Sequence, residues 1–216
     1  MFIGHFAVAF AAKKLAPKPS LGTHFIAVQF ADLLWPPLLL LGMEKVAIEP
    51  GNTAFTPLNF ISYPISHSLM MSIVWSLLFA GVYYLIKKDM KGAAVLGLAV
   101  LSHWILDVFT HRPDMPLTPG ETSYLGLGLW NSIAATIIVE GLLFFGSVTL
   151  YSRITKAMNK KGTLVLWSLV AFLALIYVMN IVGPPPPDST SIAYAGLSMW
   201  LLVAWGYWVE RNRKII

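Results

Sequence analysis

The sequence predicts an all-α protein, a polytopic transmembrane helix bundle with six full spans and one short N-terminal helix. Two observations support this fold class. Hydrophobic residues make up 57% of the 216 residues and charged residues only 12%, whereas a soluble domain carries about 25% charged residues. The apolar residues also fall into seven runs, and six of them reach the roughly 20 residues that a membrane-spanning helix needs. We therefore expect one transmembrane helical domain over residues 1–216.

The apolar runs follow one another with short connections. The first, residues 2–16, is too short to cross a bilayer, so we expect it to cover only part of the membrane. The six expected spans are 21–42, 63–86, 92–111, 124–150, 163–183 and 191–209. The connections at 43–62, 112–123 and 184–190 are expected to be loops on one side of the membrane.

Basic residues predict how the chain is oriented. Of the 15 Lys and Arg residues, all except Lys45 and Arg112 lie in alternate connections or at the C-terminus. Because cytoplasmic loops are enriched in Lys and Arg, we expect these connections and the C-terminus to be cytoplasmic. The net charge of +5 then reflects topology, and we expect no nucleic-acid partner.

Residues 102–114, with the sequence S-H-W-I-L-D-V-F-T-H-R-P-D, are the strongest functional signal. His103, Asp107 and His111 are spaced four residues apart, so a helix would place them on one face. Ionisable groups at bilayer depth are costly and usually mark a functional site. We expect His103 and Asp107 to be metal ligands. His111 and Asp114, near the outer end, could be second-metal ligands, a proton shuttle or a solvated loop pair.

Other ionisable residues fall at a similar expected depth. At about 1.5 Å per helical residue, Asp32 and His103 lie roughly 18–20 Å from the basic end. Asp32 precedes Pro36 and Pro37, which lack an N–H and are expected to break the helix there. A broken helix inside a membrane is tolerated where it lines a cavity. The alternative for Asp32 is a carboxylate bonded within a helix kink.

His5 and His67 complete the expected ligand set. His67 lies in P-I-S-H-S, where neighbouring hydroxyls could orient its ring, although a solvated interfacial histidine is the alternative. There is no cysteine, so a metal must be held by nitrogen and oxygen. Two histidines and two carboxylates suit Zn²⁺, with Mn²⁺ and Fe²⁺ as alternatives. Asp107 could also serve a second ion, together with His5 and, as a second-tier ligand, His111.

The expected chemistry is hydrolysis by metal-activated water, in the outer half of the membrane. The expected catalytic residues are Asp107, His111, Arg112 and Glu140. Arg112 could hold a substrate anion through its planar guanidinium or anchor the chain at the interface. Glu140 could be a ligand, a general base or a structural hydrogen-bonding group. His24, close to the basic end, is expected to be structural.

These motifs resemble the YdjM-type family of small bacterial and archaeal membrane-bound metal-dependent hydrolases. The features that carry the resemblance are His5 in G-H-F-A, Asp32 in the next segment, His67-Ser68 at the start of a span, and S-H-W-I-L-D-V-F-T. They cover the ligand-bearing part, residues 1–115, whereas the spans in residues 124–216 carry no matching motif. The resemblance implies an enzyme, a hydrolase in the bacterial or archaeal inner membrane.

The order of the ligands is also similar to that in the helical zinc-dependent phospholipase C and single-strand nuclease group. This second resemblance implies that a first ion is held by Asp32, His67, His103 and Asp107. It implies that His5 and Asp107 hold the second ion. No histidine follows His111, so we expect one or two ions. The leading hypothesis is a hydrolase of a lipid or lipid-linked ester, with a phosphoester preferred.

Two other functions use the same residues. A haem protein would take His67 and His103 as axial ligands, but carboxylates are unusual beside haem iron. A transporter or proton-relay protein would use the acidic residues as a relay, although the chain lacks the internal repeat that many transporters carry.

Overall fold

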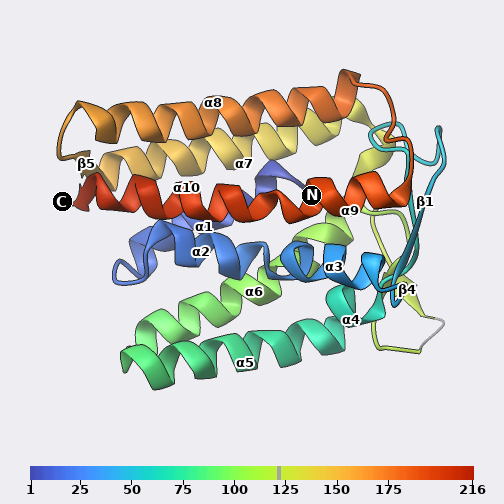
Figure 1. Cartoon of the computed structure of the whole chain (residues 1–216), viewed down its shortest axis with the longest axis horizontal. Helices are drawn as coiled ribbons and strands as arrows, with labels where there is room; N and C mark the ends of the chain where they lie inside the picture. Colours follow the sequence, from blue (N-terminus) through green and yellow to red (C-terminus); the bar gives the residue numbers. More distant parts are fainter. Residues whose placement is uncertain (121–122) are drawn as a thin grey trace.

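A computed structural model describes residues 1–120 and 123–216. Its helices run mostly along the long axis of the molecule (Figure 1). The helices are α1 (Ile3–Leu15), α2 (Leu21–Val28), α3 (Phe30–Leu40), α4 (Pro64–His67), α5 (Leu69–Lys87), α6 (Met90–Thr110), η1 (Leu129–Asn131), α7 (Ile133–Ile154), α8 (Lys160–Val182), α9 (Ser189–Leu197) and α10 (Met199–Arg211). Short antiparallel pairs are formed by β1 (Lys45–Ile48) with β2 (Leu58–Ser62), β3 (Met115–Pro116) with β4 (Tyr124–Leu125), and β5 (Thr155–Ala157) with β6 (Arg213–Ile215).

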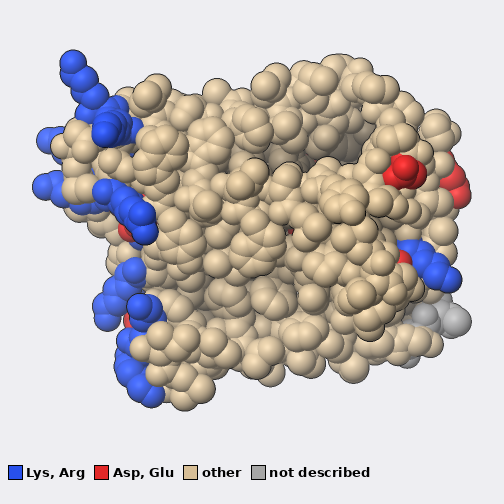
Figure 2. Space-filling view, viewed as in Figure 1, with Lys and Arg blue, Asp and Glu red and all other residues tan. Residues whose placement is uncertain are grey.

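The predicted transmembrane bundle is confirmed. In the described part of the chain, five helical segments are long and apolar enough to cross a membrane, and the bent pair α2–α3 makes a sixth candidate span. Lys and Arg side chains gather at the end that holds the C-terminus, while the broad middle of the visible face carries almost no charge (Figure 2). Such an uncharged band is what the hydrocarbon core of a bilayer requires.

One predicted span begins later than expected, and one predicted connection contains regular structure. The span expected from residue 124 begins at Ile133, because Tyr124 and Leu125 pair with β3 and Gly128 takes a positive φ of 72° before η1. Ser132 then caps α7 by accepting a hydrogen bond from the N–H of Ala135. The connection expected at 43–62 is present and contains the hairpin β1–β2. The expected loop 112–123 includes residues 121–122, which lie outside the described residues.

The helix break is real but lies at Gln29, not at the prolines. α2 and α3 meet at 56°, whereas Pro36 and Pro37 lie inside α3. Each proline removes one hydrogen-bond donor, yet α3 continues, packed against α9 and α6. At the break, the carbonyl of Val28 is bonded by a histidine side chain from α6. The bend therefore faces the interior and places Asp32 in the first turn of α3.

The short helix α1 occupies the centre of the bundle. It contacts α2, α6, α7 and α8, and most of its residues are buried. Phe6 and Phe10 pack edge-to-face on Phe25 of α2, with ring centroids 5.0 and 5.5 Å apart. A helix that is apolar on all sides belongs in a core. The first residue of α1 lies in the middle of the bundle (Figure 1), and the helix therefore places His5 in the interior.

Candidate metal centre

Five of the predicted site residues converge at one point inside the bundle. His5 comes from α1, Asp32 from α3, His67 from α4, and His103 and Asp107 from α6. All are buried except Asp32, whose side chain is 25% exposed. Within the described residues, two overlapping sets have ligand atoms within 4.8 Å of one another: His5, His103 and Asp107, and Asp32, His67 and His103. Residues far apart in the sequence thus form one donor cluster.

The spacing of the donor atoms suits a small cation. His67 Nε2 lies 3.4 Å from Asp32 Oδ1 and 4.0 Å from Asp107 Oδ2. His103 Nε2 lies 3.7 Å from Asp32 Oδ1 and 3.1 Å from Asp107 Oδ2. Ligands about 2.0–2.1 Å from a tetrahedral Zn²⁺ lie about 3.3–3.4 Å apart. The four observed distances scatter around this value, so Asp32, His67 and His103 fit three ligands of a small-cation site, with Asp107 Oδ2 beside His103.

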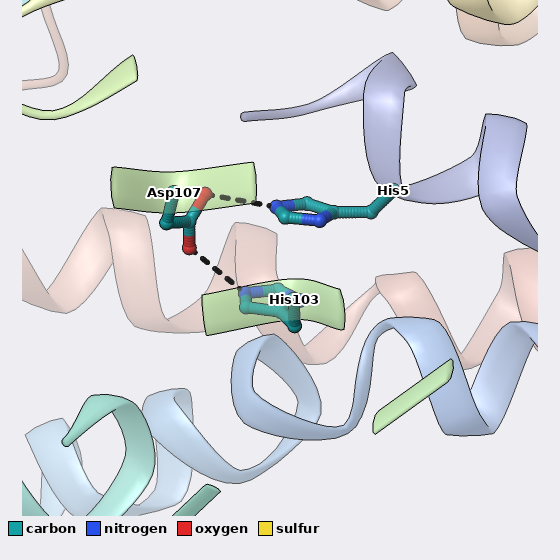
Figure 3. A group of neighbouring side chains, drawn as sticks. All are labelled: His5, His103 and Asp107. Carbon is teal, nitrogen blue, oxygen red and sulfur yellow. Dashed lines mark hydrogen bonds and ion pairs between the residues drawn. The ribbon is translucent and has the colours of Figure 1, made fainter. Parts of the chain in front are cut away.

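A second set forms on the other oxygen of Asp107. His5 Nε2 lies 3.0 Å from Asp107 Oδ1, while Oδ2 faces His103 (Figure 3). The rings of His5 and His103 stack in parallel, with centroids 3.7 Å apart and planes 7° apart. The amino nitrogen of Met1 lies 2.5 Å from the same Oδ1. Asp107 thus offers one oxygen to His5 and the other to His103, and His103 is the residue common to both sets.

His103 is oriented as a metal ligand would be. Its Nδ1 lies 2.7 Å from the carbonyl oxygen of Val28, so Nδ1 carries the proton and Nε2 keeps its lone pair. Within residues 1–120 and 123–216, His103 Nε2 is buried and has no hydrogen-bond partner. A histidine ligand usually donates its other N–H to a carbonyl or carboxylate in this way. Ser102, which precedes it, bonds to Ala99 instead.

His67 is held by a chain of hydrogen bonds that ends on a buried acid. His67 Nδ1 lies 2.6 Å from Ser66 Oγ, and that hydroxyl donates to Glu44 Oε2 at 2.6 Å. Glu44 also accepts the backbone N–H groups of Ile65 and Ser66. The Nδ1 proton is thereby fixed, and Nε2 faces Asp32. Glu44 was not among the residues predicted from the sequence.

We expect Ser66→Ala to weaken metal binding. Loss of the hydroxyl frees the His67 ring, and loss of such an outer partner typically costs about 10–100-fold in metal affinity. Chelator-competition titration of the purified protein measures the affinity. Ser72→Ala, at a buried serine in the neighbouring helix α5, is the matched control and should bind like wild type. Equal affinities for both variants would contradict the orienting role.

Glu140 holds the start of α1 in place. Its Oε2 accepts the backbone N–H groups of Phe2 and Gly4, at 3.0 and 3.1 Å. These are N–H groups that the first turn of a helix cannot satisfy itself. Glu140 is outside both ligand sets of the described residues. Of the three roles predicted for Glu140, these contacts favour the structural one, in which its carboxylate accepts both hydrogen bonds. The same contacts position His5, which follows Gly4 in the chain.

His111 lies beside the ligand sets and is in neither of them among the described residues. Its Nδ1 is 2.9 Å from Asp114 Oδ1, and the hydroxyl of Tyr63 donates to the same oxygen at 2.9 Å. Burial lowers the pKa of His111, and the hydrogen bond that its ring donates to Asp114 only partly opposes this shift. Burial, followed by the charge of Asp114, raises the pKa of Tyr63. The direction of this shift favours the neutral imidazole near pH 7, and the Asp114 carboxylate orients the ring.

The two remaining candidates are in neither ligand set of the described residues. Arg112 bonds to the side-chain oxygen of Asn59 in β2 and, through Nε at 3.3 Å, to Asp114. It therefore ties the β1–β2 hairpin to the end of α6. His24 bonds to the carbonyl of Ala16 at 3.1 Å and is fully buried, which fits the structural role expected for it.

A cavity of about 450 Å³ gives access to the cluster. Asp32, His67, Asp107 and His111 line it, together with the hairpin segment 50–58 and residues 179–186. This volume lies in the range of small-molecule sites. The hairpin that lines the cavity lies at the end of the bundle opposite the Lys and Arg side chains (Figures 1 and 2), so the cavity lies toward that end.

Comparison with known proteins identifies the family. A family model described as YdjM inner membrane protein matches residues 55–185. No curated protein and no solved structure matches the chain. The match includes His67, His103 and Asp107, and it reaches through α7 and α8, beyond the first 115 residues that contain the sequence motifs. Since it spans more than half of the chain, this multi-pass membrane protein belongs to the YdjM inner membrane protein family.

Proposed function

We propose that this protein is a metal-dependent hydrolase of a lipid or lipid-linked ester, with a phosphoester as its preferred substrate. One observation carries the proposal. Two imidazoles with oriented, available Nε2 atoms and two carboxylates converge at the wall of a cavity inside a membrane-embedded bundle. A soluble substrate would not require a site among transmembrane helices, whereas a lipid headgroup reaches one directly.

The residues take distinct roles in this proposal. Asp32, His67, His103 and Asp107 would hold a first Zn²⁺, and His5 with Asp107 a second, with Mn²⁺ or Fe²⁺ as alternatives. A bound cation would lower the pKa of a water molecule and offset negative charge on the reacting phosphoester.

His111 lines the cavity and would accept the proton of the attacking water, with Asp114 holding its ring. Arg112 fixes the hairpin over the cavity through Asn59. We place the basic end in the cytoplasm by the enrichment of Lys and Arg in cytoplasmic loops, so the site opens toward the outer half of the membrane.

The donor geometry favours this function over a haem site. His67 and His103 would have to face each other across a planar macrocycle, but both approach Asp32 Oδ1, at 3.4 and 3.7 Å. Carboxylate oxygens thus occupy the point at which the imidazoles converge, an arrangement that suits a small cation.

The test is metal analysis joined to an activity assay. We expect purified protein to carry close to stoichiometric zinc and to release product from lipid phosphoesters in vesicles. A strong chelator should abolish the release and added Zn²⁺ should restore it. His103→Ala should lose both metal and activity. A protein free of transition metal, with His103→Ala unchanged in every assay, would refute the proposal.

A further inference from the structure

A second cavity, of about 500 Å³, lies between α8 and the pair α9–α10. Phe172 and Ile176 of α8 form one wall, and Met199 and Leu202 of α10 form part of the other. Its lining is apolar apart from a few polar side chains, notably Asp32, Asn180 and Ser198. We call this cavity the α8–α10 groove. In Figure 2 the surface is hollowed between the positions that α8 and α9 occupy in Figure 1.

The groove adjoins the cavity at the candidate metal centre. Phe2, Asp32, Trp35 and Asn180 line both. Asp32 is also one of the four candidate ligands, so the apolar groove ends at the donor cluster. A molecule with a polar head and an apolar tail could place each part in matching surroundings.

The groove opens sideways, toward the hydrocarbon of the membrane. Its rim is formed by helices that qualify as membrane spans, and Phe172 and Leu201 on that rim are 40% and 71% exposed. On a membrane-spanning helix, exposed apolar side chains face lipid. The groove thus links the bilayer interior to the cluster without a path through water.

We propose that the α8–α10 groove binds an acyl chain of a membrane phospholipid, which enters sideways between α8 and α10 while its phosphoester lies at the metal centre. The placement of the headgroup rests on the proposed function. The occupancy of the groove by an acyl chain rests on its apolar lining, its opening to lipid and its continuity with Asp32. The substrate class is accordingly a phospholipid of the surrounding bilayer.

Photo-crosslinking tests the groove without relying on catalysis. The full chain is placed in vesicles that contain a phospholipid with a diazirine midway along one acyl chain, and labelled peptides are identified by mass spectrometry. We expect labelling of Phe172, Ile176, Met199 and Leu202 to exceed by several-fold that of the lipid-facing Leu77 and Leu85 of α5. Equal labelling of both sets would overturn the proposal.

A pair of tryptophan substitutions provides the matched control. Ala195 lines the groove, whereas Ala204 is exposed on α10 and is not one of the lining residues. Ala195→Trp should fill the groove and reduce its labelling by about tenfold, while labelling of α5 stays constant. Ala204→Trp should label like wild type. Equal labelling of the groove in the two variants would overturn the proposal.

Competition and metal analysis separate the remaining outcomes. Unlabelled phospholipid should compete for the groove; competition only by a polyprenyl phosphate would overturn the assignment to acyl chains. Focused labelling of a protein that binds no metal would support the groove and refute the hydrolase. Stoichiometric zinc together with equal labelling of the groove and of α5 would support the hydrolase and refute the groove.

Discussion

Replacing Asp107 by alanine should remove bound metal and abolish hydrolysis. Its two oxygens face different donors, His5 on one side and His103 with His67 on the other. In the proposed function Asp107 serves both ions, so loss of its side chain removes an anionic ligand from each. Since loss of an outer partner alone costs about 10–100-fold in metal affinity, we expect the loss of this shared ligand to exceed about 100-fold. Elemental analysis of the purified variant measures it.

Two further variants separate loss of metal from loss of fold. Asp107→Asn keeps the size of the side chain and should also lose metal, because a neutral amide is a poorer ligand than a carboxylate. Asp89→Ala, at the opposite end of α6, should retain metal like wild type. All three should show the helical circular dichroism of the wild type. Wild-type metal content in Asp107→Ala would exclude the shared-ligand role.

The membrane-spanning helices could be predicted from the sequence because bilayer thickness imposes a length and an apolar composition on each of them. The break between α2 and α3 could not be placed in the same way. Pro36 and Pro37 are the local signal for a break, but packing on α9 tolerates both. The actual break at Gln29 accompanies a bond from His103 to the carbonyl of Val28, which is a contact between distant segments.

The candidate ligands were found for a related reason. An ionisable side chain at bilayer depth is costly, so His103, Asp107 and Asp32 stand out in apolar runs, and the structure brings them together. Glu44 could not be predicted as a partner of the site, because it lies in a polar loop, where acidic residues are common. Only the β1–β2 hairpin and α4 bring it to Ser66 and His67. The orienting partners depend on the tertiary fold, which local patterns do not encode.

His111→Gln should lower the rate of hydrolysis by about 10²–10⁴-fold, the usual contribution of a general base, while metal content stays at the wild-type level. His111 lines the cavity but belongs to neither ligand set of the described residues. Glutamine keeps a polar side chain of similar size beside Asp114 but cannot accept the proton. If His111→Gln lost both metal content and rate of hydrolysis, His111 would be a metal ligand and not the general base.

The pH profile distinguishes a base from a structural residue. Burial lowers the pKa of His111 below the ordinary value of about 6.5, so its imidazole is neutral at pH 7. The wild-type rate should therefore hold as the pH falls to about 6.5 and decline below that value, when the imidazole becomes protonated. The decline should be absent in His111→Gln. His24→Gln, at a buried histidine near the basic end, should keep the wild-type profile. If His111→Gln keeps the acid decline, another group is the base.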